Sequence, residues 1–200
     1  MKKSIFTLLV AGFNLTVYSQ SAAEYSATGI EKINTNDYSG AIEDFTKAIA
    51  LEPANDNSFY NRGIARYYQK DYPGAIVDYT KAIELAPQRE YYHNRGIVKY
   101  RLKDHKGAIE DYTKAIELSP DDADDFHARA NARYDTQDFS GAIDDYSKAL
   151  VLDAEFGGAY YKRGMAKIIS GAKEDGCLDL EKAADLGIAL ASDGMLKLCK

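Results

Sequence analysis

Apolar residues recur with the period of an α-helix along most of this 200-residue chain. From Gly74 to Ile83 they occupy positions 75, 76, 79, 82 and 83, spacings that place them on one face of a helix. The same ten-residue pattern also begins at Gly40, Gly107 and Gly141, and it fades in a fifth copy at Asp175. Each copy starts 33 or 34 residues after the one before it. A fixed period in this range predicts a stack of repeated helical hairpins.

A second helical pattern precedes each copy. It reads FYNRGIARYY from Phe59 and YYHNRGIVKY from Tyr91, with related versions from Tyr25, Phe126 and Tyr160. Glycine stands in the middle of every version except the fourth, which has alanine. Glycine in mid-helix costs about 1 kcal/mol relative to alanine, so its recurrence predicts close contact between helices. Prolines at positions 53, 87 and 120 predict the breaks between the early repeats.

The two patterns together resemble the tetratricopeptide repeat (TPR). The matching features are an aromatic residue and the small residue of the first helix, alanines and an aromatic residue of the second helix, and a closing proline. The fourth repeat departs from this pattern at Ala130 and Ala154, and the fifth departs at Gly176 and Leu180. In the second repeat the matching residues are Phe59, Gly63, Ala75, Tyr79, Ala82 and Pro87.

The resemblance implies an all-α fold, a right-handed α-solenoid of five helix-turn-helix repeats. The expected repeats span residues 22–55, 56–88, 89–122, 123–156 and 157–187. Residues 188–200 are expected to form a C-terminal capping helix that covers the last repeat. Its apolar face consists of Ile188, Ala191, Met195 and Leu198.

Cys177 and Cys199 are the only two cysteines of the chain. If the chain reverses near Ile188, antiparallel helices would bring the two residues level with one another. A disulfide between them is favoured, because such bonds form in exported proteins. The alternative is a pair of buried thiols that act as small apolar residues.

The first residues have the pattern of a secretory signal peptide. Lys2 and Lys3 precede an apolar run from Ile5 to Tyr18, and small residues follow at positions 19 and 21. A short membrane anchor is the alternative, but the run is short for a span and contains Asn14. We therefore predict a signal peptide over residues 1–21 and an exported protein, either periplasmic or secreted.

Charge limits the class of partner. Removal of residues 1–21 would take away two lysines and change the net charge from −6 to −8. Nucleic acids and anionic membrane surfaces attract clusters of Lys and Arg, so an acidic chain is a poor candidate for binding either. We expect a protein or peptide partner for a chain that is itself a monomer.

In TPR proteins the first helices line a concave groove that often binds a peptide. The resemblance directs a set of mostly Tyr, Asn and His side chains into this groove. Asn can bond to both the N–H and C=O groups of a bound backbone, and Tyr is enriched in interface hot spots. Packing between helices is the alternative role for the tyrosines. The predicted groove residues are Tyr60, Asn61, Ile64, Tyr67, His93, Asn94, Ile97, Tyr100, His127, Asn131, Tyr134 and Tyr161.

Some TPR domains clamp a C-terminal carboxylate with Lys, Asn and Arg residues of their first helices. Asn61 and Asn94 are compatible with part of that set. Ser26 and Ile30 stand where the resemblance calls for a lysine and a further asparagine. Binding of chaperone tails is therefore not predicted.

The sequence shows no motif of an enzyme or a cofactor site. A nucleophile elbow, a phosphate loop and a zinc-protease helix are all missing from it. His93 and His127 have no further ligand at metal-binding spacing, and the acidic run 121–125 lacks the glycine of a calcium loop. We predict a non-enzymatic adaptor of the bacterial envelope that holds a partner segment in its groove. The alternative is a structural scaffold that self-associates through its uncapped first repeat.

Overall fold

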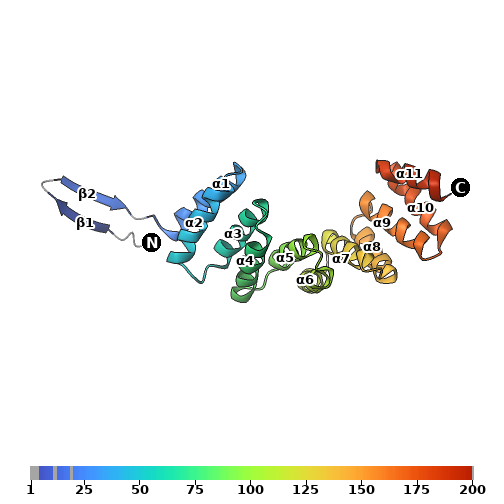
Figure 1. The fold of residues 1–200 in the computed structure, drawn as a ribbon, viewed down its shortest axis with the longest axis horizontal. Coiled ribbons are helices and arrows are strands. Elements are labelled where there is room, and N and C mark those ends of the chain that lie inside the picture. The colour runs from blue at the N-terminus through green and yellow to red at the C-terminus, as the bar shows by residue number, and fades with distance from the viewer. Residues whose placement is uncertain (1–4, 11–12, 19, 200) are drawn as a thin grey trace. The chain divides into compact units, whose positions relative to one another are not determined.

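The computed structural model describes residues 5–10, 13–18 and 20–199. Over this part of the chain, a short β-hairpin is followed by eleven helices (Figure 1). The chain divides into two compact modules, an N-terminal module of residues 1–87 and a C-terminal module of residues 88–200.

The N-terminal module begins with the hairpin. Strand β1 (Ile5–Val10) pairs antiparallel with β2 (Phe13–Tyr18), so that Ile5 lies opposite Tyr18. The sequence predicts a signal peptide here and no folded element, and residues 1–4, 11–12 and 19 of that segment lie outside the described residues. Both strands are rich in β-branched and aromatic residues, which favour extended backbone.

Four helices complete the N-terminal module: α1 (Ala22–Asn34), α2 (Tyr38–Leu51), α3 (Asp56–Tyr68) and α4 (Tyr72–Leu85). Helix α1 starts behind a capping box, in which Ser21 Oγ accepts from the Glu24 N–H and the Glu24 carboxylate accepts from the Ser21 N–H. Such a cap contributes about 1 kcal/mol. Cleavage of the predicted signal peptide before Ser21 would keep this cap, whereas cleavage after it would remove it.

The C-terminal module contains three further helical hairpins and a final helix. These are α5 (Arg89–Arg101), α6 (His105–Leu118), α7 (Ala123–Asp135), α8 (Phe139–Leu152), α9 (Gly157–Ile169), α10 (Lys173–Asp185) and α11 (Ala189–Leu198). In both modules, therefore, each expected repeat contains a first helix and a second helix.

The turns inside the first four repeats share one arrangement. Their middle residue has positive φ, as in Lys70 (66°) and Lys103 (67°), which lets the first helix end in a left-handed residue. An aspartate then caps the second helix: the Asp71 side chain accepts from the N–H of Gly74, and Asp104 does the same for Gly107. The repeated Asp-x-x-Gly spacing in the sequence is thus a helix-start signal.

The mid-helix glycines of the first helices sit against the aromatic residue of the second helix. A Cβ atom built on Gly63 would lie 2.7 Å from the Tyr79 ring, and one on Gly96 would lie 2.8 Å from the Tyr112 ring. Both rings are buried at 2% exposure. The close helix contact that the recurrent glycine predicts is present in these repeats.

Ion pairs with a buried aspartate also join the two helices of every repeat. Asp78 of α4 is unexposed, and α3 binds it through Arg62 (Nη2 to Oδ1, 2.7 Å) and Arg66 (Nη1 to Oδ2, 2.9 Å). We call this arrangement the aspartate clamp. Its other members are Asp111 with Arg95 and Lys99, Asp145 with Arg129 and Arg133, Asp179 with Arg163 and Lys167, and Asp44 with Lys32 and Thr28.

The clamp also connects neighbouring repeats. Arg129 Nη1 donates to Thr113 Oγ1 at 3.1 Å, and Arg163 Nη1 donates to Ser147 Oγ at 3.0 Å, each on the second helix of the preceding repeat. In the first repeat, burial opposes ionisation of Asp44, but hydrogen bonds from Lys32 and Thr28 outweigh it and lower the pKa of that carboxyl. The clamp therefore fixes helices both within and between repeats.

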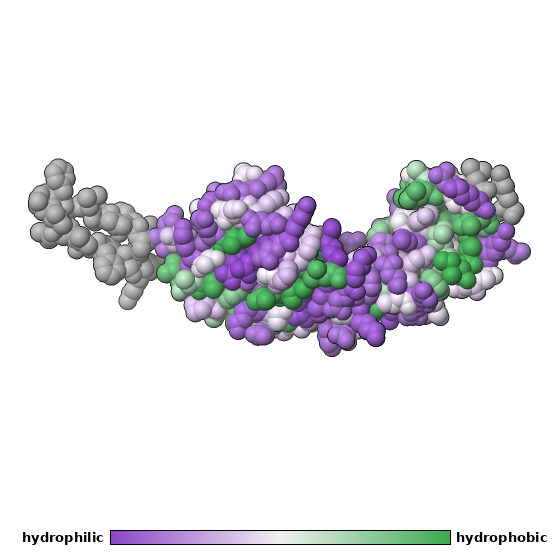
Figure 2. Space-filling model, in the orientation of Figure 1, coloured by the Kyte–Doolittle hydropathy of each residue, from purple (hydrophilic) through white to green (hydrophobic). Residues whose placement is uncertain are grey.

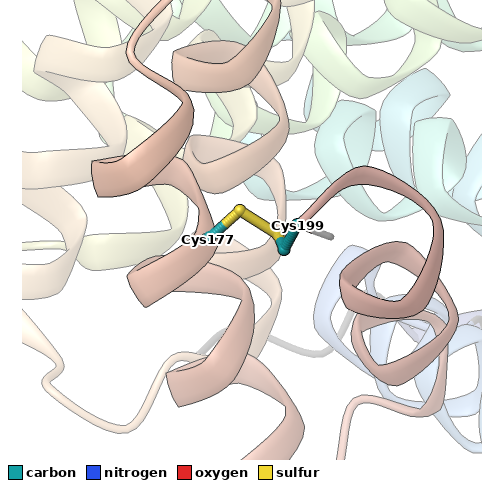
Figure 3. The surroundings of a disulfide bond; sticks show 2 residues. All are labelled: Cys177 and Cys199. Atoms are coloured by element: carbon teal, nitrogen blue, oxygen red, sulfur yellow. A yellow bond between two sulfur atoms is a disulfide. The ribbon is translucent and has the colours of Figure 1, made fainter.

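Helix α11 packs on α10 and is tied to it by a disulfide between Cys177 and Cys199 (Figure 3). The Cα atoms are 5.8 Å apart, and the bond joins residues separated by 22 positions. Closing a loop of that size stabilises a fold by about 3 kcal/mol in the chain-entropy model. On the predicted capping face, Ala191 is fully buried, and Ile188 packs beside Gly157 at the start of α9.

The contact at Gly96 leads to a stability prediction. Gly96→Leu forces a side chain into the Tyr112 ring, and overpacking of this kind costs about 1–3 kcal/mol. We expect thermal denaturation of the variant to occur roughly 3–10 °C below that of the wild type. The matched change Ala130→Gly, at the same place in the fourth repeat, should lower the melting temperature less. An unchanged melt for Gly96→Leu would contradict the close contact.

Candidate functional site

The predicted groove residues lie on first helices, and all twelve are half-buried. The N-terminal module holds four of them on α3, and the C-terminal module holds the other eight. On α3 these are Tyr60, Asn61, Ile64 and Tyr67, on α5 His93, Asn94, Ile97 and Tyr100, on α7 His127, Asn131 and Tyr134, and on α9 Tyr161.

In the N-terminal module, α1, α3 and the loop before α3 border an open pocket of about 410 Å³. Among the predicted groove residues, Asn61 lines it, and its Nδ2 atom donates to the Asn57 carbonyl at 2.8 Å. Ser26 and Ile30, the two residues that break the carboxylate-clamp pattern, line the same pocket. The remaining lining residues are Ala23, Ala27, Glu52, Asn55, Asn57 and Ser58.

The tyrosines of α3 pack against other aromatic rings of the N-terminal module. The Tyr60 ring lies 5.8 Å from that of Tyr79, and Tyr67 lies 5.4 Å from Tyr68 and 5.9 Å from Tyr72. Burial raises the pKa of the Tyr79 hydroxyl, so it stays protonated. Tyr60 and Tyr67 therefore contact rings of α4, as in the packing role considered as the alternative for these tyrosines.

In the C-terminal module, several predicted side chains bridge neighbouring first helices. His93 of α5 is bonded through Nδ1 to the buried carboxylate of Asp125 on α7. The Tyr100 hydroxyl of α5 donates to Asp135 of α7 at 2.5 Å. Burial and this hydrogen bond raise the pKa of Tyr100 to about 12. These contacts hold the side chains in place in the absence of a partner.

The link between α7 and α9 is a cation–π contact. The Lys162 ammonium lies 5.1 Å from the centre of the Tyr134 ring. Between α5 and α7, Arg89 forms ion pairs with Asp122 and Asp125 at the start of α7. Sequence reasoning missed these pairs because their members are more than 25 positions apart in the chain.

Asn131 and His127, both half-buried, make contacts within the C-terminal module. Asn131 Oδ1 accepts from the Tyr146 hydroxyl at 2.8 Å, and its Nδ2 atom faces His127 Nδ1 at 3.4 Å. The His127 ring packs 4.4 Å from the Phe156 ring. Burial lowers the pKa of His127 to about 4, so the imidazole is neutral at pH 7.

A second surface of the C-terminal module is apolar. Figure 2 shows hydrophobic side chains over α10 and α11, where Leu178 and Leu190 are each 63% exposed. Leu178 occupies the repeat position held by Glu43, Val77, Glu110 and Asp144 in the other repeats. This surface belongs to a second helix and the cap, and not to the first helices that carry the predicted groove residues.

Other site chemistries find little support in the described part of the chain. There, His, Cys, Asp and Glu side chains form no group of three or more suited to hold a metal ion. A search of the same residues found no helix with the length and hydrophobicity needed to cross a membrane. The His105 ring lies 5.2 Å from the ring of Tyr100.

Known protein families and solved structures resemble this chain. The tetratricopeptide repeat model of protein families matches residues 57–89 and 90–122, and a second TPR model matches residues 33–70. A search of curated proteins found no significant sequence match. The TPR fold and the all-α class predicted from the sequence are confirmed by these matches and by the solved structures that resemble the chain.

Three of those structures illustrate the similarity. A MamA protein is 21% identical, with a TM-score of 0.78 over 88% of this chain and 94% of its own. YrrB, described as a TPR protein with an unusual peptide-binding site, is 19% identical, with a TM-score of 0.79 over 89% of this chain and 93% of its own. MamA from Desulfovibrio magneticus RS-1 is 19% identical, with a TM-score of 0.79 over 84% and 96%. At these identities the similarity concerns the fold.

The environment of His127 predicts a pH dependence. Its folded pKa of about 4 lies below the unfolded value of roughly 6.5, so only the unfolded chain takes up this proton between the two. Stability should be unaffected above pH 6.5 and fall by about 2–3 kcal/mol as the pH drops toward 4. Urea denaturation of His127→Phe at pH 7 and pH 4.5 should show a smaller loss than the wild type. Equal losses in both proteins would contradict a buried neutral histidine.

Proposed function

We propose that this chain, whose residues 33–122 match tetratricopeptide repeat models, is a non-enzymatic adaptor whose first helices bind a segment of a partner protein. Repeat folds of this kind present long surfaces of neighbouring helices in place of a single catalytic cleft. The partner is a protein or peptide, and its identity is set by the side chains that these surfaces carry.

One observation carries this proposal. Six half-buried residues of the C-terminal module form what we call the first-helix band: His93, Asn94, Ile97, Tyr100, Tyr134 and Tyr161. The band combines aromatic area with hydrogen-bonding groups, a composition typical of interface hot spots. Contacts of His93 with Asp125, Tyr100 with Asp135, and Lys162 with Tyr134 already restrict its side chains.

Restricted side chains favour binding, because less conformational entropy is lost when the partner arrives. The structural similarity to YrrB, whose description names a peptide-binding site, adds support at the level of the fold. A self-associating scaffold is the competing function. Sedimentation of the protein over a range of concentrations distinguishes the two, since a scaffold would form larger species and an adaptor would not.

The proposal includes export into the bacterial envelope or beyond it. Its support is the basic and apolar pattern of residues 1–21 and the disulfide between Cys177 and Cys199, a bond typical of oxidising compartments. Expression of the full chain in a bacterium, followed by fractionation and intact-mass measurement, tests it. A full-length product confined to the cytoplasm would contradict export.

The band is tested by substitution of two of its members. In the variant Asn94→Ala with Tyr161→Ala, we expect the captured partner to bind at least about tenfold more weakly, since each hot-spot truncation costs about 1 kcal/mol or more. The readout is quantitative capture from an envelope extract, followed by titration of the recovered partner.

The control is Glu110→Gln with Lys114→Gln, which changes two exposed residues of α6. It should bind the partner as the wild type does. Equal binding by the band variant and this control, with both variants folded by circular dichroism, would place the contact outside the first-helix band.

A further inference from the structure

The pocket between α1 and α3 is apolar on one side and polar on the other. Ala23, Ala27 and Ile30 of α1 give it an apolar wall, and Ile30 is 45% exposed. On the other side lie Asn61 of α3 and Glu52 of the loop after α2. Within the described part of the chain, Glu52 is the one charged residue that lines this pocket.

The polar groups of the pocket include donors and acceptors, and the Glu52 carboxylate supplies their only charge within the described part of the chain. The Ser26 and Ser58 hydroxyls lie 3.1 Å apart and bond to each other. One N–H of the Asn61 Nδ2 group donates to the Asn57 carbonyl, and the Asn61 Oδ1 atom can accept from a donor outside. Glu52 accepts one long hydrogen bond of 3.3 Å from Asn55 and forms no ion pair with the described residues.

Acceptors that face an apolar wall suit a ligand with a hydrocarbon stem and a cationic head. Lysine and arginine side chains have this form: their methylenes cover apolar surface while the head binds carboxylate and amide oxygens. A carboxylate would meet Glu52 with no cation to balance it. The volume of about 410 Å³ lies in the range of small ligand sites and accommodates one long side chain with adjoining backbone.

We propose that this pocket binds a lysine or arginine side chain of the partner segment, with the charged head at Glu52 and Asn61. The inference rests on the proposed function, since it names the chemistry of a partner that the adaptor would hold. It gives the N-terminal module a preference for basic segments.

The experiment uses a phage-displayed library of random twelve-residue peptides, selected on the immobilised full chain. Selection on the wild type should enrich Lys or Arg at one fixed position of the recovered peptides. The leading peptide and a version with methionine at that position are then synthesised, and their affinities are measured by fluorescence polarisation.

The variant is Glu52→Gln, and the matched control is Glu43→Gln, an equal charge change at an exposed position of α2. Replacement of the basic residue of the peptide with methionine should weaken peptide binding to the wild type and to the control by about three- to tenfold. The same replacement should have little effect on binding to Glu52→Gln, because the two groups act as a pair. Thermal melts of both variants should match the wild type, since each changed residue is exposed.

The outcomes separate the two proposals. Recovered peptides without a basic preference, or a basic residue whose effect is the same in Glu52→Gln, would overturn the inference and leave peptide binding intact. A selection that recovers no binding peptide would overturn both the inference and the proposed function.

Discussion

The aspartate clamp is the interaction on which the rest of the structure depends. Much of each repeat core consists of alanines, such as Ala75 and Ala82, which bury little area and define few contacts. The clamp fixes how the two helices face each other. Asp78 forms ion pairs with Arg62 (Nη2 to Oδ1, 2.7 Å) and Arg66 (Nη1 to Oδ2, 2.9 Å) of the facing helix. Loss of one partner from a buried pair of this kind costs about 3–5 kcal/mol, because the remaining charge is left without a counter-ion.

The clamp and the candidate site share the same helices. Arg129 binds Asp145 and donates to Thr113 of the preceding repeat, so it links the third and fourth repeats. Tyr134 lies farther along α7 and meets Lys162 of α9. The ion pairs therefore help to hold the helices that carry the first-helix band. A repeat fold can then change its outward side chains while the clamp keeps the helices in register.

The sequence predicts this architecture well, for physical reasons. The 33- or 34-residue period counts the repeats, and the glycine at Gly63 or Gly96 indicates a contact too close for a side chain. The clamp escaped prediction because a charged residue in a helical pattern is normally assigned to the solvated face, and Asp145 lies 16 positions from Arg129. The roles of Asn131 and His93 also escaped it. Each depends on a contact with another helix, which no local pattern encodes.

Amide hydrogen exchange of Asp145→Asn tests the central role of the clamp most directly. The account predicts faster exchange in α7 and α8, which Asp145 joins, and in α6 through the Arg129–Thr113 bond. The neighbouring exposed change Asp144→Asn should leave exchange in all three helices as in the wild type. Unchanged protection of α7 and α8 in Asp145→Asn would show that alanine packing alone holds the repeat, and would contradict the account.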